Sequence, residues 1–257
     1  MSGVRAFVLG GVDAAAALDW LHVHGDVDGV IEGDSTFTVY SRASLPKLPF
    51  ASVSVREIVV SADSIEATGL ENDAPILVAA DLLVRPPWVA RPPDFVGVEL
   101  VVPRGNAFGS GEHASTKAAL RCLHRAWNSP ASVADVGTGS GILALYAAVR
   151  GCRRVEACDI EEPAVAAARE LLPSARVRLG AADTMGACDC VVANMTGTEL
   201  TASMPAILRC WTRRDALVLS GMRAHEVAAV VAMVDAPIVD RETVEAFTAV
   251  VFRGKAT

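Results

Sequence analysis

From Ser132 onward, short apolar segments with strand character alternate with segments of helical periodicity, and this alternation restricts the chain to few folds. The strand candidates are residues 132–136, 154–158, 175–179, 189–193 and 215–220, and the helical segments are 141–150, 162–172, 198–211 and 223–234. Regular succession of strand, helix and strand predicts a parallel sheet with helices on both faces. The last two strand candidates, 237–241 and 245–252, are too close for a crossover helix, so we expect them to pair antiparallel at the sheet edge.

The first part of the chain has a different pattern, which predicts a small α+β domain. Its expected elements are a strand at 4–9, a helix at 13–23, strands at 27–31 and 36–41 around a turn at 32–35, an alternating segment at 53–60 and a short helix within 61–73. Two proline pairs, Pro86–Pro87 and Pro92–Pro93, then interrupt any helix. We therefore expect a substrate-recognition domain at 1–74, an extended proline-rich linker at 75–104 and a second domain at 105–257.

The net charge of −7 is concentrated in the first two-fifths of the chain. Residues 1–98 carry 6 Lys and Arg against 13 Asp and Glu, whereas residues 99–257 carry 17 of each sign. Binding to nucleic acid needs clustered Lys and Arg, so we expect no direct contact with nucleic acid. The acidic surface predicts a basic macromolecular partner or, alternatively, only a solubilising surface.

The sequence shows no sign of a membrane segment, of export or of a metal site. No apolar run reaches the ~18 residues that span a bilayer, and the apolar stretch 6–12 is followed by Asp13 instead of a cleavage site. The six cysteines form no CxxC pair, which is typical of reduced core residues. We therefore expect a cytoplasmic protein without a metal or disulfide framework.

A glycine-rich turn follows the first predicted strand of the second domain. From Asp135 it reads DVGTGSG, with glycines at Gly137, Gly139 and Gly141, and it runs directly into a helix. Such glycines let backbone approach a ligand closely at the carboxyl end of a strand. A nicotinamide-binding turn has the spacing GxGxxG, whereas GxGxG after an acid suits a zwitterionic amino-acid tail better than a diphosphate. The alternative is a turn that only packs the helix against the sheet.

Two further acids favour S-adenosylmethionine over a nucleotide. Asp159 follows the second strand, 22 residues after Gly137, where a carboxylate can accept both hydroxyl groups of an adenosine ribose. Asp183 ends the segment after the third strand and is placed to reach adenine. Each also has a simpler interpretation, Asp159 as a charge at a helix N-terminus and Asp183 as a loop acid.

Five stretches of the second domain match one known family in order and separation. They read NAFGSGEHAST, VADVGTGSGILAL, CDIEEPAVAAARE, DCVVANMTGTEL and LSGMRAHE, and corresponding stretches of that family have the form FGTGTHPTT, VANIL and LSGIL. Over roughly residues 82–254 the chain resembles the PrmA family, the methyltransferases of the eleventh large-subunit ribosomal protein. The resemblance implies a class I methyltransferase fold, a Rossmann-like doubly wound sheet with an antiparallel edge strand. It also implies S-adenosylmethionine as methyl donor, with S-adenosylhomocysteine as product.

The family's cofactor-binding residues fall, position by position, on Thr116, Gly137, Asp159 and Asn194. Asn194 ends the fourth strand beside the glycine turn, and it is also the candidate catalytic residue. Its amide oxygen can orient an amine for attack on the methyl group, a step that needs positioning more than acid–base help. The simpler interpretation is that Asn194 caps the following helix.

The glycine-rich stretch before the first helix of this domain can close over the cofactor as a lid. It contains Phe108, Glu112 and His113, and the helix is expected to begin near Ser115. His113 and Thr116 then face the site, unless their polar groups only cap the helix.

The chain departs from the family pattern at several points. Glu112 stands where threonine is usual, Ala114 replaces proline, and the strand-end motif reads NMTG instead of NILA. The first domain is shorter and lacks the tryptophan-bearing acidic segment that usually precedes the linker. Because the family's first domain recognises the ribosomal substrate, these departures concern the substrate more than the chemistry.

We therefore predict methyl transfer from S-adenosylmethionine to amino groups of a protein, either a lysine side chain or an N-terminal amine, with a basic ribosomal protein as the leading partner. The second hypothesis is an N-methyltransferase that acts on a peptide or small amine of a specialised pathway. A third is a protein that binds the cofactor or a nicotinamide nucleotide without catalysis, and the intact set of family positions speaks against it.

Overall fold

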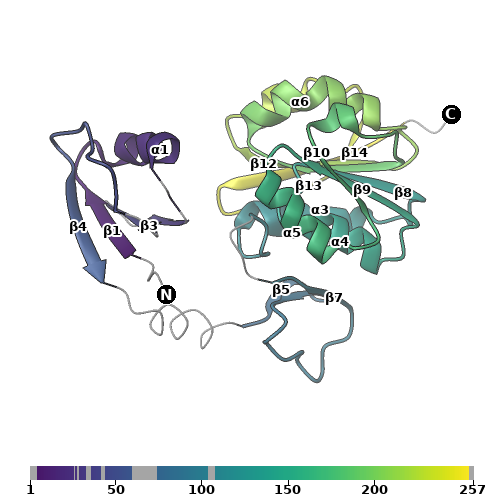
Figure 1. Ribbon diagram of the computed structural model, residues 1–257. Helices are drawn as coiled ribbons and strands as arrows, with labels where there is room; N and C mark the ends of the chain where they lie inside the picture. Colours follow the sequence, from purple (N-terminus) through teal and green to yellow (C-terminus); the bar gives the residue numbers. More distant parts are fainter. Residues whose placement is uncertain are drawn as a thin grey trace. The chain divides into compact units, whose positions relative to one another are not determined.

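The computed structural model describes residues 5–25, 27, 29–32, 36–41, 44–59, 74–103 and 108–254 (Figure 1). It divides into two compact units, residues 1–73 and 74–257, which are described separately below. Most of the turn expected at 32–35 and the short helix expected within 61–73 lie outside the described residues.

The described residues of the first unit form an antiparallel sheet and one helix. Its strands, β1 (Arg5–Gly10), β2 (Gly29–Glu32), β3 (Thr36–Ser41) and β4 (Ser54–Val59), lie in the order β2-β3-β1-β4. Helix α1 (Ala14–His24) lies against β1 and β3. Leu9, Leu21 and Val39 are fully buried between helix and sheet because they are apolar on the facing sides of these elements. The predicted small α+β fold is confirmed.

The second unit is built on a seven-stranded mixed sheet. Five parallel strands are β8 (Ser132–Val136), β9 (Arg154–Asp159), β10 (Arg176–Leu179), β11 (Cys190–Asn194) and β12 (Ala216–Arg223). Strands β13 (Ile238–Val244) and β14 (Phe247–Arg253) complete the order β10-β9-β8-β11-β12-β14-β13. The predicted parallel sheet with a mixed edge is therefore confirmed.

The antiparallel strand of this sheet is β14, which lies one place in from the edge. Residues 248–252 are buried along β14, whereas β13 carries Asp240, Arg241 and Glu242 and has mostly exposed residues. An interior strand must be apolar on both faces, and a charged strand at the edge resists pairing with other chains. The apolar run of β14 therefore takes the interior position and β13 the edge.

Helices cover both faces of the large sheet (Figure 1). One face carries α3 (Ala114–Ala126), α4 (Ile142–Val149) and α5 (Glu162–Leu171), and the other carries α6 (Gly197–Cys210) and the short α7 (Val227–Val231). The helix predicted at 223–234 is shorter because β12 continues through Gly221, at φ +94°, to Arg223. None of the helices in the described part of the chain has the length and apolar character of a membrane span.

Residues 75–104 differ from the expected extended linker, because they contribute a small sheet to the second unit. Strands β5 (Ile76–Ala79) and β6 (Leu82–Arg85) form a hairpin, and β7 (Val98–Val101) pairs parallel with β6. Their buried side chains belong to the same core as α3 and α4. Both proline pairs lie between β6 and β7, so the prolines interrupt the sheet locally without separating it from the core.

Candidate functional site

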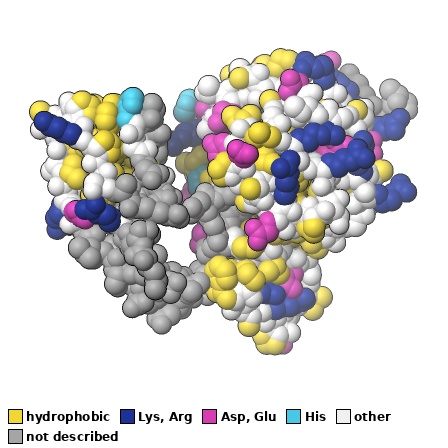
Figure 2. Space-filling model, in the orientation of Figure 1, with side chains coloured by type: hydrophobic (Ala, Val, Ile, Leu, Met, Phe, Trp, Pro, Cys, Tyr) yellow, Lys and Arg dark blue, Asp and Glu magenta, His cyan; other side chains and the backbone are white. Residues whose placement is uncertain are grey.

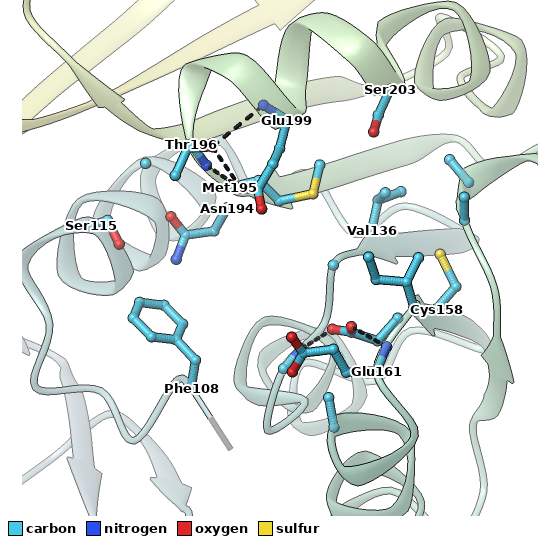
Figure 3. A pocket seen from close by; sticks show the side chains of 18 of the residues that line it. Phe108, Ser115, Val136, Cys158, Glu161, Asn194, Met195, Thr196, Glu199 and Ser203 are labelled. Carbon is cyan, nitrogen blue, oxygen red and sulfur yellow. Dashed lines mark hydrogen bonds between the residues drawn. The ribbon is translucent and has the colours of Figure 1, made fainter. Parts of the chain in front are cut away.

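A cavity of about 630 Å³ opens at the carboxyl ends of the parallel strands of the second unit. Figure 3 shows its labelled lining on three sides: Phe108, Ser115 and Asn194 on one, Val136, Cys158 and Glu161 opposite, and Met195, Thr196, Glu199 and Ser203 between them. Open α/β sheets bind their ligands at this end of the strands. The cavity is therefore the candidate functional site.

The glycine turn after β8 forms part of the cavity wall. Gly137 and Gly139 line the cavity, and all three glycines have positive φ, +68°, +54° and +92° in chain order. A Cβ on Gly139 would lie 2.4 Å from the carbonyl oxygen of Phe108, so only glycine fits there. Gly141 does not line the cavity but begins α4, where it packs against Ala168 and Leu172.

Asp159 lies at the end of β9, lines the cavity and ties the glycine turn to the next loop. Its Oδ2 accepts the backbone N–H of Gly139 at 2.9 Å, and its Oδ1 accepts that of Glu161 at 3.0 Å. The carboxylate is thus fixed beside the backbone of the turn. It remains half-buried at the cavity wall, within reach of a bound ligand.

Asp135 differs from the expected ligand contact, because it is fully buried and does not line the cavity. Its Oδ2 accepts hydrogen bonds from Thr138 Oγ1 at 2.7 Å and from the backbone N–H of Ala144 at 3.1 Å, and its buried Oδ1 has no partner in the part of the chain that the structure describes. The side chain therefore points under the turn, which it holds against the start of α4. The sequence shows that an acid precedes the glycines but not which way the side chain points.

Burial gives Asp135 a stability effect that depends on pH. It raises the pKa of this carboxyl from 3.8 to about 6, so the folded protein binds more protons here than the unfolded chain between about pH 4 and pH 6. The contribution of Asp135 to stability consequently falls as pH rises through that window, by up to about 3 kcal/mol. As pH rises from 4 to 7, we expect the free energy of unfolding of Asp135→Asn to increase by this amount relative to that of the unmodified protein. Urea unfolding of both proteins across that range measures it, and a pH-independent difference would contradict it.

Asn194 lines the cavity and has a buried amide oxygen for which the described residues offer no hydrogen-bond partner. It ends β11 and lines the cavity, and its Nδ2 donates to Oγ1 of Thr116 at 3.4 Å. Thr116 is fully buried in α3 and does not line the cavity itself. Oδ1 of Asn194 is buried and has no hydrogen-bond partner among the described residues. A buried acceptor without a partner is costly, so this atom is ready for a donor from a ligand.

Helix α6 is capped by Thr196, so Asn194 is not needed as its cap. The Thr196 hydroxyl accepts the backbone N–H of Glu199 at 3.3 Å, and the Glu199 carboxylate accepts the backbone N–H of Thr196 at 2.8 Å. This reciprocal pair is a capping box. The interpretation of Asn194 as a helix cap is therefore wrong.

The expected lid residues divide between the cavity and the surface. Phe108 and His113 line the cavity with ring centroids 5.1 Å apart, and His113 lies 4.6 Å from the ring of Phe247. Nδ1 of His113 accepts the backbone N–H of Ser115 at 3.2 Å and thereby caps α3. Burial lowers the pKa of His113, which keeps the ring neutral for this role.

Two other expected site residues lie outside the cavity lining. Glu112 is exposed, and its carboxylate accepts a hydrogen bond from Ser110 Oγ at 3.1 Å. Asp183 is exposed in the 3₁₀ turn η1 (Ala182–Thr184), although the neighbouring segment 180–182 does line the cavity. The strand-end position of Asp183 thus predicts the correct region but not a contact.

The structure adds lining residues that the sequence reasoning missed. Thr196 and Glu199 carried a local signal, the spacing T-x-x-E that marks a capping box. Arg223 and Phe247 carried none, because pairing of β12 with β14 brings them together from distant parts of the chain. The guanidinium carbon of Arg223 lies 5.7 Å from the centre of the Phe247 ring, and both residues line the cavity.

The comparison with known proteins agrees with this geometry. The family described as ribosomal protein L11 methyltransferase (PrmA) matches residues 53–248. The chain belongs to the PrmA family. This confirms the family that the sequence motifs indicated. The match includes every candidate site residue named above.

Individual PrmA relatives resemble part of the chain. Ribosomal protein L11 methyltransferases from Thiobacillus denitrificans and Dechloromonas aromatica are 35% and 34% identical over 181 and 193 residues. These matches cover 69% and 74% of this chain and 60% and 64% of the relatives, and a match from Syntrophotalea carbinolica covers only 50% of that relative. The chain thus spans between half and two thirds of the length of these relatives.

A solved PrmA structure supports the fold. The ribosomal protein L11 methylase from Lactobacillus delbrueckii subsp. bulgaricus superposes with a TM-score of 0.64 at 26% identity, covering 70% of this chain and 98% of that one. The expected class I methyltransferase fold is therefore confirmed.

Proposed function

We propose that this PrmA-family protein transfers methyl groups from S-adenosylmethionine to amino groups of a protein, with ribosomal protein L11 as the leading acceptor. The observation that supports it most directly is that Asn194 lines the cavity and that its buried Oδ1 has no hydrogen-bond partner among the described residues. An amine N–H is a donor that this oxygen can accept. The names of the relatives, which are L11 methyltransferases, supply the candidate acceptor.

The chemistry of the cavity fits S-adenosylmethionine, whose sulfonium supplies the methyl group when it is bound. Gly137 and Gly139 let the backbone approach the amino-acid tail, and Asp159 accepts the ribose hydroxyls. Val136 and Ile160 offer apolar surface for the adenine. Three residues behind the cavity wall hold this surface in place. Asp135 and Gly141 hold the glycine turn, and Thr116 holds the side chain of Asn194.

Asn194 orients the acceptor amine in this proposal. Thr116 holds its Nδ2, which directs Oδ1 to the incoming N–H. His113 does not take the amine proton, because its Nδ1 is engaged with Ser115 and its other ring nitrogen carries the hydrogen of the neutral ring. His113 and Phe108 instead cover the cavity.

Methylation of L11 tests the proposal directly. The full chain is incubated with L11 and isotope-labelled S-adenosylmethionine, and mass spectrometry locates the label. We expect label on lysine side chains or on the N-terminal amine. Label on small amines but not on L11 would favour the specialised-pathway hypothesis. Calorimetric binding of NADH without binding of S-adenosylmethionine would contradict the proposal.

The charge of the first part of the chain leads us to propose a basic acceptor, met in the cytoplasm and recognised by residues 1–74. Residues 1–98 have an excess of seven acids, which attracts a cationic protein over long range. We expect the KM for L11 to rise severalfold from about 0.1 M to about 1 M salt, because the Debye length falls from about 10 Å to about 3 Å. The KM for S-adenosylmethionine, measured in parallel, is the control. If the KM for L11 does not change with salt, the acidic residues serve only to keep the protein soluble.

A further inference from the structure

The cavity wall next to Asn194 is more polar than the family pattern. The family forms NILA and LSGIL place leucine, alanine and leucine where this chain has Thr196, Gly197 and Arg223. Thr196 and Arg223 line the cavity, and Gly197 lies directly behind them at the start of α6. This side of the cavity therefore carries a hydroxyl group and a guanidinium group, both of which can form hydrogen bonds with a polar ligand.

Glu226 contacts both Gly197 and the backbone of Arg223. A Cβ on Gly197 would lie 2.6 Å from Cβ of Glu226, so the alanine of the family pattern does not fit beside this side chain. The carboxylate of Glu226 accepts the backbone N–H of Arg223 at 2.7 Å. Gly197 thus makes room for Glu226, and Glu226 fixes the backbone of Arg223.

The guanidinium of Arg223 is available to a ligand. It is exposed, belongs to a residue that lines the cavity and lies over the ring of Phe247 in a cation–π contact. No other side chain in the described ranges forms an ion pair or hydrogen bond with it, since Glu226 contacts only the backbone of Arg223. The remaining charged side chains of the lining are acids: Asp159, Glu161, Glu199 and Glu226. Among the described residues, Arg223 is therefore the one Lys or Arg side chain that lines the cavity, and none of the described side chains forms an ion pair with its guanidinium.

The register of β11 and β12 sets the spacing between this cation and Asn194. Ser220 pairs with Asn194, and Arg223 follows Ser220 by three residues on β12. The register of β12 shifts between Leu219 and Met222, where Gly221 has φ +94°, so the Cα atoms of Ser220 and Arg223 are separated by at most about 10 Å. An acceptor that reaches both residues therefore carries its second group within a few residues of its amine.

From this arrangement, and resting on the proposed methyl transfer, we infer that Arg223 binds an acidic side chain of the acceptor. The preferred acceptor is then a peptide segment with Asp or Glu about three residues from the methylated amine. Guanidinium and carboxylate form charge-assisted, bidentate hydrogen bonds, and the cation–π contact with Phe247 favours this position of the guanidinium. A protein that is basic overall can contain such a local acid, so the inference is compatible with long-range attraction to residues 1–98.

Matched peptides test the inference. Each contains one lysine as acceptor and has Glu, Gln or Arg three residues away on either side. We expect the full chain to prefer the Glu peptide to the Arg peptide by about tenfold to a hundredfold in kcat/KM, mainly through KM. Arg223→Leu, which restores the residue of the family pattern, abolishes this preference, and Arg223→Glu reverses it. If the peptides are not turned over, they are compared as competitors of L11 methylation.

Arg214→Leu is the matched control, because Arg214 is exposed, precedes β12 at its opposite end and does not line the cavity. This variant keeps the preference of the unmodified chain. Equal use of the three peptides by the unmodified chain would overturn the inference and leave the proposed function standing. Weaker binding of S-adenosylmethionine to Arg223→Leu would also overturn it, because Arg223 would then bind the carboxylate of the cofactor and not that of the acceptor. Absence of methylation of any peptide and of L11 would contradict the proposed function itself.

Discussion

Replacing Asn194 by alanine is expected to lower kcat by about a hundredfold while cofactor affinity changes much less. Alanine removes Oδ1, the buried acceptor that has no partner within the described structure. Without it the amine is misplaced, and displacement of a nucleophile by about 1 Å can cost on the order of a hundredfold in rate. Single-turnover methylation of L11 measures the rate, and calorimetry with S-adenosylhomocysteine measures cofactor affinity.

Variants at Thr116 provide the control for Asn194. Thr116→Ser keeps the hydroxyl that accepts from Nδ2 of Asn194, and Thr116→Val removes it while preserving the shape of the side chain. We expect the serine variant to resemble the unmodified protein and the valine variant to lose part of the rate. If Asn194→Ala keeps the turnover of the unmodified protein, Asn194 has no role in the reaction. A role as helix cap is not an alternative, because Thr196 caps α6.

The second large effect is expected on cofactor binding, where Asp159→Ala should lower affinity by at least tenfold and up to about a thousandfold. The carboxylate now accepts the backbone N–H groups of Gly139 and Glu161, and the proposed ribose contacts add to these. Each charge-assisted hydrogen bond contributes about 1.5–3 kcal/mol, so loss of two such bonds is enough for the expected range. Calorimetry with S-adenosylmethionine and its product gives the dissociation constants.

Asp183→Ala is the matched control for Asp159→Ala. Both residues are acids near the ends of neighbouring strands, but Asp183 is exposed and does not line the cavity. We expect its removal to change affinity less than twofold. Thermal unfolding of both variants checks that the fold is intact. A larger loss for Asp183→Ala than for Asp159→Ala would place the ribose on the other acid.

Features that depend on residues close together in the sequence could be predicted from it. The five parallel strands, the glycine turn and the strand-end residues Asp159 and Asn194 all lie where the periodicity placed them. This follows because strand ends in a doubly wound sheet converge on one edge, so a local pattern fixes an approximate place in space. The strand ends therefore predict the edge of the sheet at which the cavity opens.

Features that depend on side-chain direction or on distant pairing could not be predicted in this way. Asp135 and Asp159 both stand at strand ends, but only Asp159 lines the cavity, because the path of the turn directs Asp135 beneath it. Arg223 and Phe247 meet only through the register of β12 and β14. The proline pairs predicted a linker because a proline restricts the backbone only at its own position and at the residue before it. The flanking strands are buried because they pack in one core with α3 and α4, and the proline pattern carries no information about that packing.

The position of β14 also determines when the second unit can complete its folding during synthesis. Strand β14 is the last of the seven in chain order, yet it lies between β12 and β13 and brings Phe247 to the cavity. Until β14 has emerged from the ribosome, the apolar β12 keeps an unpaired edge, which favours aggregation and binding by chaperones. A nascent chain that ends before residue 247 therefore has an open cavity wall. The large sheet is thus completed only after translation has passed Arg253, whereas the described strands of the first unit end at Val59.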